Sequence, residues 1–242
     1  MPGLDAFTSL QRETTLRESR PGLSYAAPQA MLAPPATERL QPAIKRAMDV
    51  LGAGAMLLIL SPVFLILALL VRADGGAAFF AHRRVGRDGE GFGCLKFRSM
   101  VMDSQARLEA LLASDPAARA EWDAARKLKN DPRVTRIGRF LRATSLDELP
   151  QLLNVLRGEM SLVGPRPVIQ PELDRFYGAA AMHYMMVRPG ITGLWQVSGR
   201  SDTSYAQRVA LDVAYVSRPS LMQDIRILLR TPVAVLSRRG AC

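Results

Sequence analysis

The most pronounced feature of the hydropathy pattern is an apolar run in the first third of the chain. Between Val50 and Val71 no residue is charged and most are apolar. A straight helix of that length is about 33 Å long and would cross a bilayer. Ser61 and Pro62 fall at its middle, where proline removes a backbone donor and serine can satisfy a freed carbonyl. The pattern predicts a re-entrant membrane helix over residues 43–74 that breaks at Ser61 and Pro62.

Charges on both sides of this run favour the re-entrant path. Lys45 and Arg46 precede it, and Arg72, Arg83 and Arg84 follow it. Since positively charged flanks stay in the cytoplasm, both ends are expected on that side of the membrane. Each half is about 16 Å long, enough to reach roughly the bilayer midplane and return. A kinked transmembrane helix is the alternative, because proline is common in spanning helices.

The chain before this run shows no periodic pattern. Residues 1–42 contain scattered proline, serine, arginine and alanine, a composition typical of disorder. The apolar run also begins too late for a secretory signal peptide. We expect a disordered leader over residues 1–42, the membrane helix over 43–74 and one catalytic domain over 75–242.

Two short stretches after the apolar run alternate in the manner of β-strands. They cover Arg83–Val85 and Phe92–Arg98, and a glycine-rich turn that contains Asp88 joins them. Alternation places Lys96 and Arg98 on one face of this β-hairpin, which suits phosphate binding. An exposed strand edge protected by positive charge is the alternative.

Helical spacing of apolar residues dominates the rest of the chain. Helices are predicted at residues 103–112, 115–129, 149–156, 204–216 and 221–236. The arginines of the last helix are compatible with a place in the membrane interface, and closure of the core is the alternative. The predicted fold class is α+β and mostly helical, with a re-entrant membrane helix hairpin, a small β-hairpin, and interfacial and globular helices around a cytosolic catalytic site.

Composition adds a strong positive charge to this picture. The formal net charge is +10, and guanidinium groups dominate because only four of the basic residues are lysines. Such a surface suits bidentate phosphate recognition or an anionic membrane, although a bias towards arginine codons explains part of it. Nucleic acid is disfavoured, since no recognised motif or interleaved aromatic set accompanies the charge. Cys94 and Cys242 fit no zinc spacing, and the two histidines argue against a transition-metal site.

Two adjacent carboxylates interrupt this arginine-rich background. Asp147 and Glu148 precede an apolar helix face that ends at Gly158. The exposed N–H groups of a helix start stabilise a carboxylate and also attract a phosphate. Ser145 and Glu148 also match a capping box, which is the purely structural alternative. The arginines that recur every third residue upstream, and that a helical path would wind towards the acids, are Arg133, Arg136, Arg139 and Arg142.

A short proline-rich turn supplies a further candidate anion site. Pro165 and Pro167 restrict the backbone around Arg166, which lowers the entropy lost when that side chain engages a ligand. The turn suits a phosphate or nucleotide clamp. A simple structural turn is the alternative.

The segment from Thr144 to Pro167, TSLDELPQLLNVLRGEMSLVGPRP, resembles the core of the bacterial sugar transferases known as monotopic phosphoglycosyl transferases. The resemblance runs from about Lys45 to about Leu236. The further motifs that carry it are Lys45-Arg46-x-x-Asp49, Arg84-Val85-Gly86, Lys96-Phe97-Arg98 and Arg188-Pro189-Gly190-Ile191-Thr192-Gly193. Within that family, the sequence is similar to members that start exopolysaccharide synthesis by transferring galactose phosphate.

This resemblance implies a reaction and a site. The enzyme would pass a sugar-1-phosphate from a UDP-sugar to undecaprenyl phosphate and release UMP. Asp147 would be a covalent nucleophile, and Glu148 would act beside it and help to hold Mg²⁺. Galactose is the first expectation for the sugar and glucose the second. The residues implied in charge stabilisation and substrate placement are Lys96, Arg98, Arg136, Arg142, Pro165, Arg166 and Pro167.

The same resemblance places the protein at the bacterial inner membrane, with its catalytic domain on the cytoplasmic face and in contact with membrane lipids. It leaves a homo-oligomer open. Two other functions are compatible with the residues. One is a glycosyltransferase that moves only the sugar and releases UDP. The other is a membrane-anchored basic scaffold that binds anionic lipid or polysaccharide.

Overall fold

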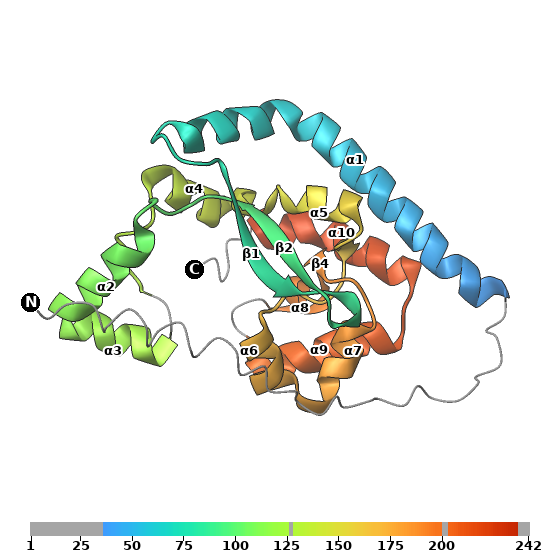
Figure 1. The fold of residues 1–242 in the computed structure, drawn as a ribbon. Coiled ribbons are helices and arrows are strands. Elements are labelled where there is room, and N and C mark those ends of the chain that lie inside the picture. Colours follow the sequence, from blue (N-terminus) through green and yellow to red (C-terminus); the bar gives the residue numbers. More distant parts are fainter. Residues whose placement is uncertain (1–35, 126–127, 200–202, 237–242) are drawn as a thin grey trace, which may run out of the picture. The chain divides into compact units, whose positions relative to one another are not determined.

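The computed structural model describes residues 36–125, 128–199 and 203–236 (Figure 1). The chain divides into two compact units, Met1–Arg39 and Leu40–Cys242, and the fold described below is that of the second unit. Residues 1–35 of the predicted leader and Cys242 lie outside the described residues. Residues 36–42 were predicted to be disordered, but they are helical. Alanine, glutamate, arginine and leucine, which are good helix formers, make up most of residues 36–40.

Helix α1 (Ala36–Arg72) is one continuous helix that contains Pro42 and Pro62. Figure 1 shows it bending in its second half. Pro62 has no N–H for the carbonyl of Leu58, and the Ser61 hydroxyl donates to that same carbonyl at 2.8 Å. The predicted break is therefore a bend within one helix, because serine replaces the hydrogen bond that proline removes.

The exposed surface of α1 is apolar. Its mean hydropathy reaches 2.8, and only 11% of the most apolar window is buried. Leu51, Leu58 and Ile59 are each more than 70% exposed. Such a contiguous apolar surface marks a membrane or protein contact site. A membrane contact for α1 agrees with the hydropathy pattern, whereas re-entrance itself stays a prediction.

Strands β1 (Phe79–Val85) and β2 (Gly91–Phe97) form the predicted antiparallel hairpin. The turn between them places Asp88 in the left-handed region, which aspartate tolerates better than most residues. The hairpin begins earlier than predicted because Phe79 stacks on Phe97, with ring centroids 5.4 Å apart, and both rings contact Phe64 of α1. These three rings fix the hairpin to the membrane helix.

The remaining elements confirm a mostly helical α+β fold. In chain order they are η1 (Arg87–Gly89), α2 (Ser104–Ser114), α3 (Pro116–Ala125), α4 (Arg136–Thr144), η2 (Leu146–Glu148), α5 (Gln151–Arg157), β3 (Ser161–Val163), α6 (Gln170–Glu172), η3 (Leu173–Tyr177), η4 (Gly178–Ala180), α7 (Ala181–Met185), β4 (Gly190–Thr192), α8 (Leu194–Ser198), α9 (Tyr205–Ser217) and α10 (Leu221–Leu236). The parallel pair β3 and β4 was not predicted. The backbones of Gly164 and Gly190 approach so closely beside it that a Cβ on Gly190 would lie 2.1 Å from the Gly164 nitrogen.

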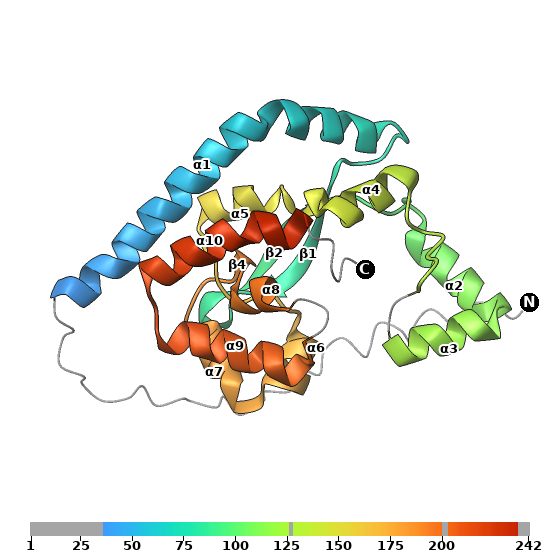
Figure 2. The same cartoon turned by 180° about the vertical axis from the view of Figure 1, so that it is seen from behind.

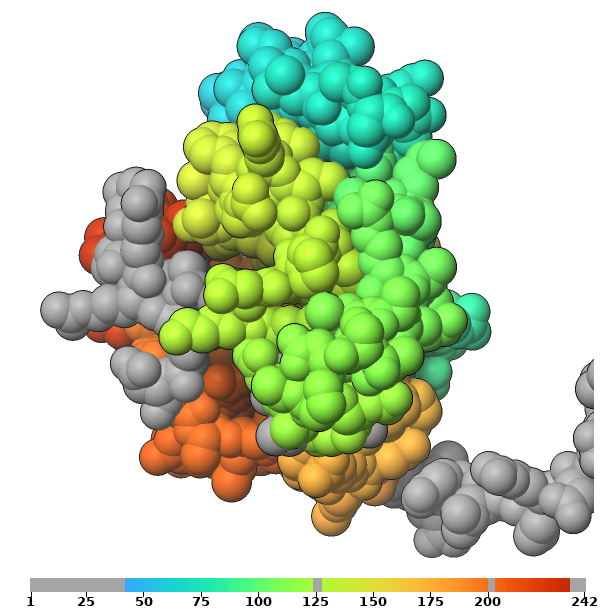
Figure 3. All heavy atoms as spheres, turned by 90° about the vertical axis from the view of Figure 1, so that its left-hand side faces the viewer, coloured from blue at the N-terminus to red at the C-terminus, as the bar shows by residue number. Residues whose placement is uncertain are grey.

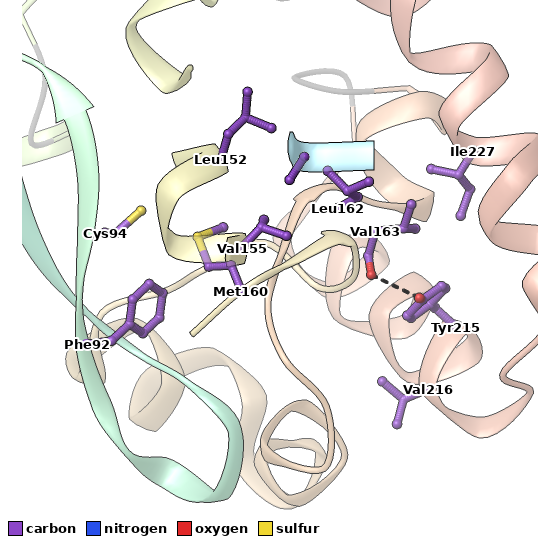
Figure 4. Packing of buried hydrophobic residues seen from close by; sticks show 11 residues of the cluster. Phe92, Cys94, Leu152, Val155, Met160, Leu162, Val163, Tyr215, Val216 and Ile227 are labelled. Carbon is purple, nitrogen blue, oxygen red and sulfur yellow. Dashed lines mark hydrogen bonds between the residues drawn. The ribbon is translucent and has the colours of Figure 1, made fainter. Parts of the chain in front are cut away.

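The main core lies between the hairpin and the C-terminal helices (Figure 4). Leu152 and Val155 of α5 pack with Leu162 and Val163 of β3, and Tyr215 of α9 closes the cluster. The Tyr215 hydroxyl donates to the Val163 carbonyl at 3.1 Å. Seen from behind, α8 lies between α9 and α10 (Figure 2). The predicted helices α5, α9 and α10 thus form the scaffold that holds β3 in place.

A buried polar network attaches the first part of α1 to this core. The Lys45 ammonium lies 3.0 Å from Asp49 and 3.3 Å from Asp224, and it donates to the Ser161 hydroxyl at 2.6 Å. Asp49 in turn accepts from the Leu162 N–H at 3.0 Å. Because Asp49 and Asp224 are nearly inaccessible to water, the network holds α1 firmly against β3 and α10.

The last helix closes the core, which was one of the two alternatives considered for it, whereas its place in the membrane interface stays a prediction. Ile227 is buried in the core, whereas Met222, Leu229 and Val233 are exposed on another face of α10. Helix α4 packs against the second half of α1 (Figure 3). It likewise exposes one large apolar side chain, that of Phe140. Both helices therefore carry exposed apolar side chains, and α4 carries one beside α1.

Asn154 connects α5 to the strand that carries Lys96, and we expect its loss to destabilise the fold. The buried amide accepts from the Leu95 N–H at 2.9 Å and donates to the Gly93 carbonyl at 2.8 Å. Asn154→Leu leaves both backbone groups without partners, so the free energy of unfolding should fall by about 2–4 kcal/mol. Thermal and denaturant unfolding followed by circular dichroism would measure it.

The exposed Ser114→Ala serves as the control and should change stability by less than about 0.5 kcal/mol. Equal stability of the two variants would show that Asn154 does not hold β2.

Candidate functional site

A cavity of about 810 Å³ is lined by residues of α1, the hairpin, η2 and the C-terminal helices. Its size is within the range of small-molecule sites. One part of its wall is charged and includes Lys96 of β2 and the acids of η2. Another part is apolar and includes Met56 of α1, Leu162 of β3 and Leu228 of α10. The cavity therefore joins a charged region to the membrane helix.

The two acids lie in a single helical turn between α4 and α5. Ser145 adopts the left-handed conformation that ends α4, and η2 follows at once. Ser145 makes no side-chain cap, so the capping box considered as the structural alternative does not form. Asp147 is 9% exposed, and both Asp147 and Glu148 line the cavity. The prediction that the acids precede a helix start is confirmed, since α5 begins three residues later.

Lys96 holds the two acids together. Its ammonium lies 2.7 Å from Glu148 Oε1 and 3.5 Å from Asp147 Oδ2. Alternation along β2 was expected to place Lys96 on a face that suits phosphate binding, and the structure places it against these two carboxylates. The ion pair is partly shielded from water, because the Lys96 side chain is only 25% exposed. Charge interactions are stronger there than on an open surface.

The environment shifts the pKa values of the two acids in opposite directions. Burial raises the pKa of Asp147 above its usual value, although the charge of Lys96 opposes this. Burial acts on Glu148 in the same direction, but Lys96 and Arg166 outweigh it and lower the pKa of that carboxyl. The pKa of Lys96 rises because the two acids outweigh its burial. Carboxyl groups whose pKa values are shifted by burial and by a specific charged partner are typical of functional sites.

The structure brings Arg142 and Arg166 to the cavity, as predicted. Arg142 Nε donates to the Ser99 hydroxyl at 2.9 Å. Arg166 is exposed between the buried Pro165 and Pro167, so the rigid turn presents its guanidinium to the cavity.

Arg84 is a site residue that the sequence did not single out. It lines the cavity, and its guanidinium lies 3.2 Å from Nδ1 of His82. Since arginine can only donate, this His82 nitrogen is the acceptor, and the histidine is neutral. Burial and then the charge of Arg84 lower the pKa of His82, which agrees with that state. The hairpin register was the available signal, because the pairs Phe80↔Lys96 and Arg84↔Phe92 place Arg84 and Lys96 on the same face.

Arg98 lines the cavity, and in this structure its side chain anchors the hairpin. All five of its N–H donors are used, by both carboxylate oxygens of Asp74 and by the carbonyls of Val71, Ala77 and Met100. No donor is left for a ligand, so Arg98 anchors the hairpin to the end of α1.

Arg136, which was expected to help place the substrate, is not brought to the cavity. It is exposed at the start of α4 and does not line the cavity. Arg133 pairs with Asp131, at 2.7 Å, and Arg139 is exposed. Residues three apart in an α-helix are rotated by about 60° from one another, so these arginines diverge. Only Arg142, in the last turn of α4, reaches the acids.

The donor set fits magnesium bound together with a substrate. Among the residues that the structure describes, no group of three or more histidine, cysteine, aspartate or glutamate side chains surrounds one point. Asp147 and Glu148 nevertheless offer adjacent carboxylates in a cavity. Mg²⁺ is commonly held by one or two carboxylates, substrate phosphates and waters, so these residues are suited to it. Magnesium binding at Glu148 stays a prediction.

Comparison with known proteins matches residues 40–238 to the family model described as bacterial sugar transferase. The chain is 59% identical over 198 residues to a UDP-galactose-lipid carrier transferase of Erwinia amylovora and 55% identical to an undecaprenyl-phosphate galactose phosphotransferase of Salmonella typhimurium. Each alignment covers 82% of this chain but only 41% of the relative. The exopolysaccharide production protein ExoY of Rhizobium meliloti is 54% identical, with 81% of this chain and 87% of ExoY covered.

The ion pairs of Lys96 predict an altered response of stability to pH. In the wild type the pKa of Glu148 is lowered, so this group stabilises the fold above its usual pKa of 4.5, and the contribution is lost as the pH falls through the lowered value. In Lys96→Met both carboxylates lose their main countercharge, and their protonation should then stabilise the fold.

Melting temperatures measured between pH 7 and about pH 4 would test this. We expect acid to lower the melting temperature of Lys96→Met less than that of the wild type, or to raise it. Arg119→Met, which removes an exposed charge from α3, should follow the wild type. Parallel pH profiles for all three proteins would contradict the assigned role of Lys96.

Proposed function

This chain belongs to the bacterial sugar transferase family, and from that premise we propose that it transfers a sugar-1-phosphate from a UDP-sugar to undecaprenyl phosphate. UMP is the leaving product, and the reaction is the first membrane step of exopolysaccharide synthesis. Galactose is the proposed sugar, in line with the names of the relatives from Erwinia amylovora and Salmonella typhimurium. The single observation that carries the proposal is a pair of adjacent carboxylates, one of them buried, in a cavity that extends to the membrane helix.

Asp147 is the proposed nucleophile. A carboxylate oxygen forms a bond to the phosphorus nearer the sugar, and the bond from that phosphorus to the bridging oxygen breaks, so that UMP leaves with the electron pair. An oxygen of the lipid phosphate then bonds to the same phosphorus and releases the carboxylate. The raised pKa of Asp147 favours this role, because a more basic carboxylate is a better nucleophile. Glu148 is held by Lys96 at 2.7 Å, and its pKa is lowered.

The cations around the cavity would stabilise the charge of the reacting diphosphate. Lys96 and Arg142 are the positive groups whose charges stabilise the ionised form of Asp147. The same two charges would attract the phosphate that is transferred and help to position it beside this carboxylate. Bound Mg²⁺, held by Glu148 with phosphate oxygens and waters, would further neutralise the diphosphate.

The membrane helix gives this chemistry its location. We place the catalytic domain on the cytoplasmic face of the inner membrane, with α1 re-entering the bilayer and α4 and α10 at the interface. The Lys45 network and the contacts of Phe64 with Phe79 and Phe97 keep α1 fixed to the domain. The lipid phosphate would reach Asp147 along the apolar wall formed by Met56 and Leu228.

Removal of the nucleophile should stop the reaction. Asp147→Asn is expected to lower kcat by on the order of 10³-fold or more, since both half-reactions need the carboxylate. The test measures the nucleotide released from a panel of UDP-sugars, with undecaprenyl phosphate present. Asp123→Asn removes an exposed acid of α3 and should behave as the wild type.

UDP as the released nucleotide would instead support a glycosyltransferase that moves only the sugar. The scaffold would be supported if the wild type and both variants released no nucleotide and all bound lipid and polysaccharide equally well.

The path of α1 is open to a labelling experiment. In a background of Cys94→Ala and Cys242→Ala, single cysteines at Ile44 and Ala73 would report the two ends of the helix, because both positions are exposed. Re-entrance predicts that a membrane-impermeant maleimide labels both only in inside-out vesicles. Labelling of the two positions from opposite sides would show that α1 spans the membrane. Replacing Ser61 and Pro62 by leucine should move Ile44 to the far side.

A further inference from the structure

A recess in the cavity wall divides the charged groups into two sets. It is lined by Arg84, Arg166, Lys96 and Glu148, but Asp147 and Arg142 line only the main cavity. The electrostatic interactions follow the same division. The charge of Arg142 lowers the pKa of Asp147, whereas the charges of Arg166 and Arg84 lower the pKa of Glu148. The site thus has a nucleophile end, which contains Asp147, and a second end, which contains two guanidinium groups.

Arg84 and Arg166 lack the partners that such groups usually have. Neither forms an ion pair with an acid among the described residues, and Arg84 is half-buried. The two guanidinium groups also repel each other, and this repulsion and burial lower the pKa of Arg84. Placing like charges together in a partly desolvated recess costs free energy, which an anion bound between them would recover.

On the basis of the function proposed above, we infer that Arg84 and Arg166 clamp the phosphate that is not transferred. In the first half-reaction this is the phosphate of the departing UMP. In an in-line displacement the leaving group departs on the side opposite the nucleophile. The lipid phosphate must then attack the phosphorus opposite Asp147, which is the position from which UMP left. One clamp therefore serves the nucleotide phosphate first and the lipid phosphate second.

The dimensions of the recess agree with this assignment. Its free volume is about 10 Å³, which admits a phosphate oxygen but not a nucleoside or a lipid chain. The uridine and the polyprenyl chain would therefore extend into the larger cavity, the second of them towards the apolar wall. His82 positions the clamp, because its Nδ1 accepts from the Arg84 guanidinium.

Neighbouring arginines on opposite faces of β1 provide a matched test. Arg84→Gln removes a clamp residue, whereas Arg83→Gln removes an exposed arginine beside it. The three measurements are UMP affinity, exchange of labelled UMP into UDP-galactose without lipid, and transfer from the loaded enzyme to undecaprenyl phosphate. Arg84→Gln should weaken UMP binding about tenfold and slow both half-reactions about 10²-fold. Arg83→Gln should match the wild type.

Arg84→Lys keeps the charge but not the planar fork, and it should recover only part of the loss. Melting curves would show that all the variants are folded. Equal behaviour of Arg84→Gln and Arg83→Gln would overturn the clamp. If Arg84→Gln slowed UMP exchange but not transfer to undecaprenyl phosphate, the clamp would not serve both phosphates. A wild type that binds UMP but neither exchanges it nor transfers sugar phosphate would refute the proposed function and not the binding of UMP at Arg84.

Discussion

The ion pairs of Lys96 are the interaction on which the site depends. Two adjacent carboxylates in a shielded cavity would repel each other, and burial would favour their neutral forms. One ammonium group, 2.7 Å from Glu148 and 3.5 Å from Asp147, keeps Glu148 ionised and holds the pair in one geometry. The position of Lys96 is fixed in turn by β2, whose backbone is bonded to Asn154 of α5. The charge distribution of the site thus follows directly from the packing of the hairpin against the core.

Contacts between α1 and the domain set where that site lies relative to the lipid. The Lys45 network ties the first part of the helix to β3 and α10, and Arg98 ties its end to the hairpin. Between these two attachments, Met56 enters the cavity wall while Leu58 and Ile59 are exposed. Because α1 is fixed at both ends, its apolar surface lies next to the charged part of the cavity without a separate membrane-binding domain.

The sequence predicted those features that depend on local pattern. The period of apolar residues located α5, α9 and α10, the Asp88 turn located the hairpin, and the adjacent acids located the site. Features that depend on long-range contacts were missed. Arg84 is brought to Lys96 only by cross-strand pairing, and Arg98 is satisfied by carbonyls that become available where α1 ends. Four arginines at regular spacing indicated a convergence that the helical rotation prevents. The short strands β3 and β4 lie beside a close approach of the Gly164 and Gly190 backbones, which no local pattern reveals.

The central claim is that Asp147 carries the phosphosugar between two substrates of different solubility. Intact mass spectrometry of the wild-type protein incubated with UDP-galactose alone, followed by fragmentation, tests it most directly. One added phosphohexose is expected, located on the peptide that contains Asp147 and lost when undecaprenyl phosphate is supplied. An unmodified protein under these conditions, with sugar phosphate transferred only when both substrates are present together, would contradict it.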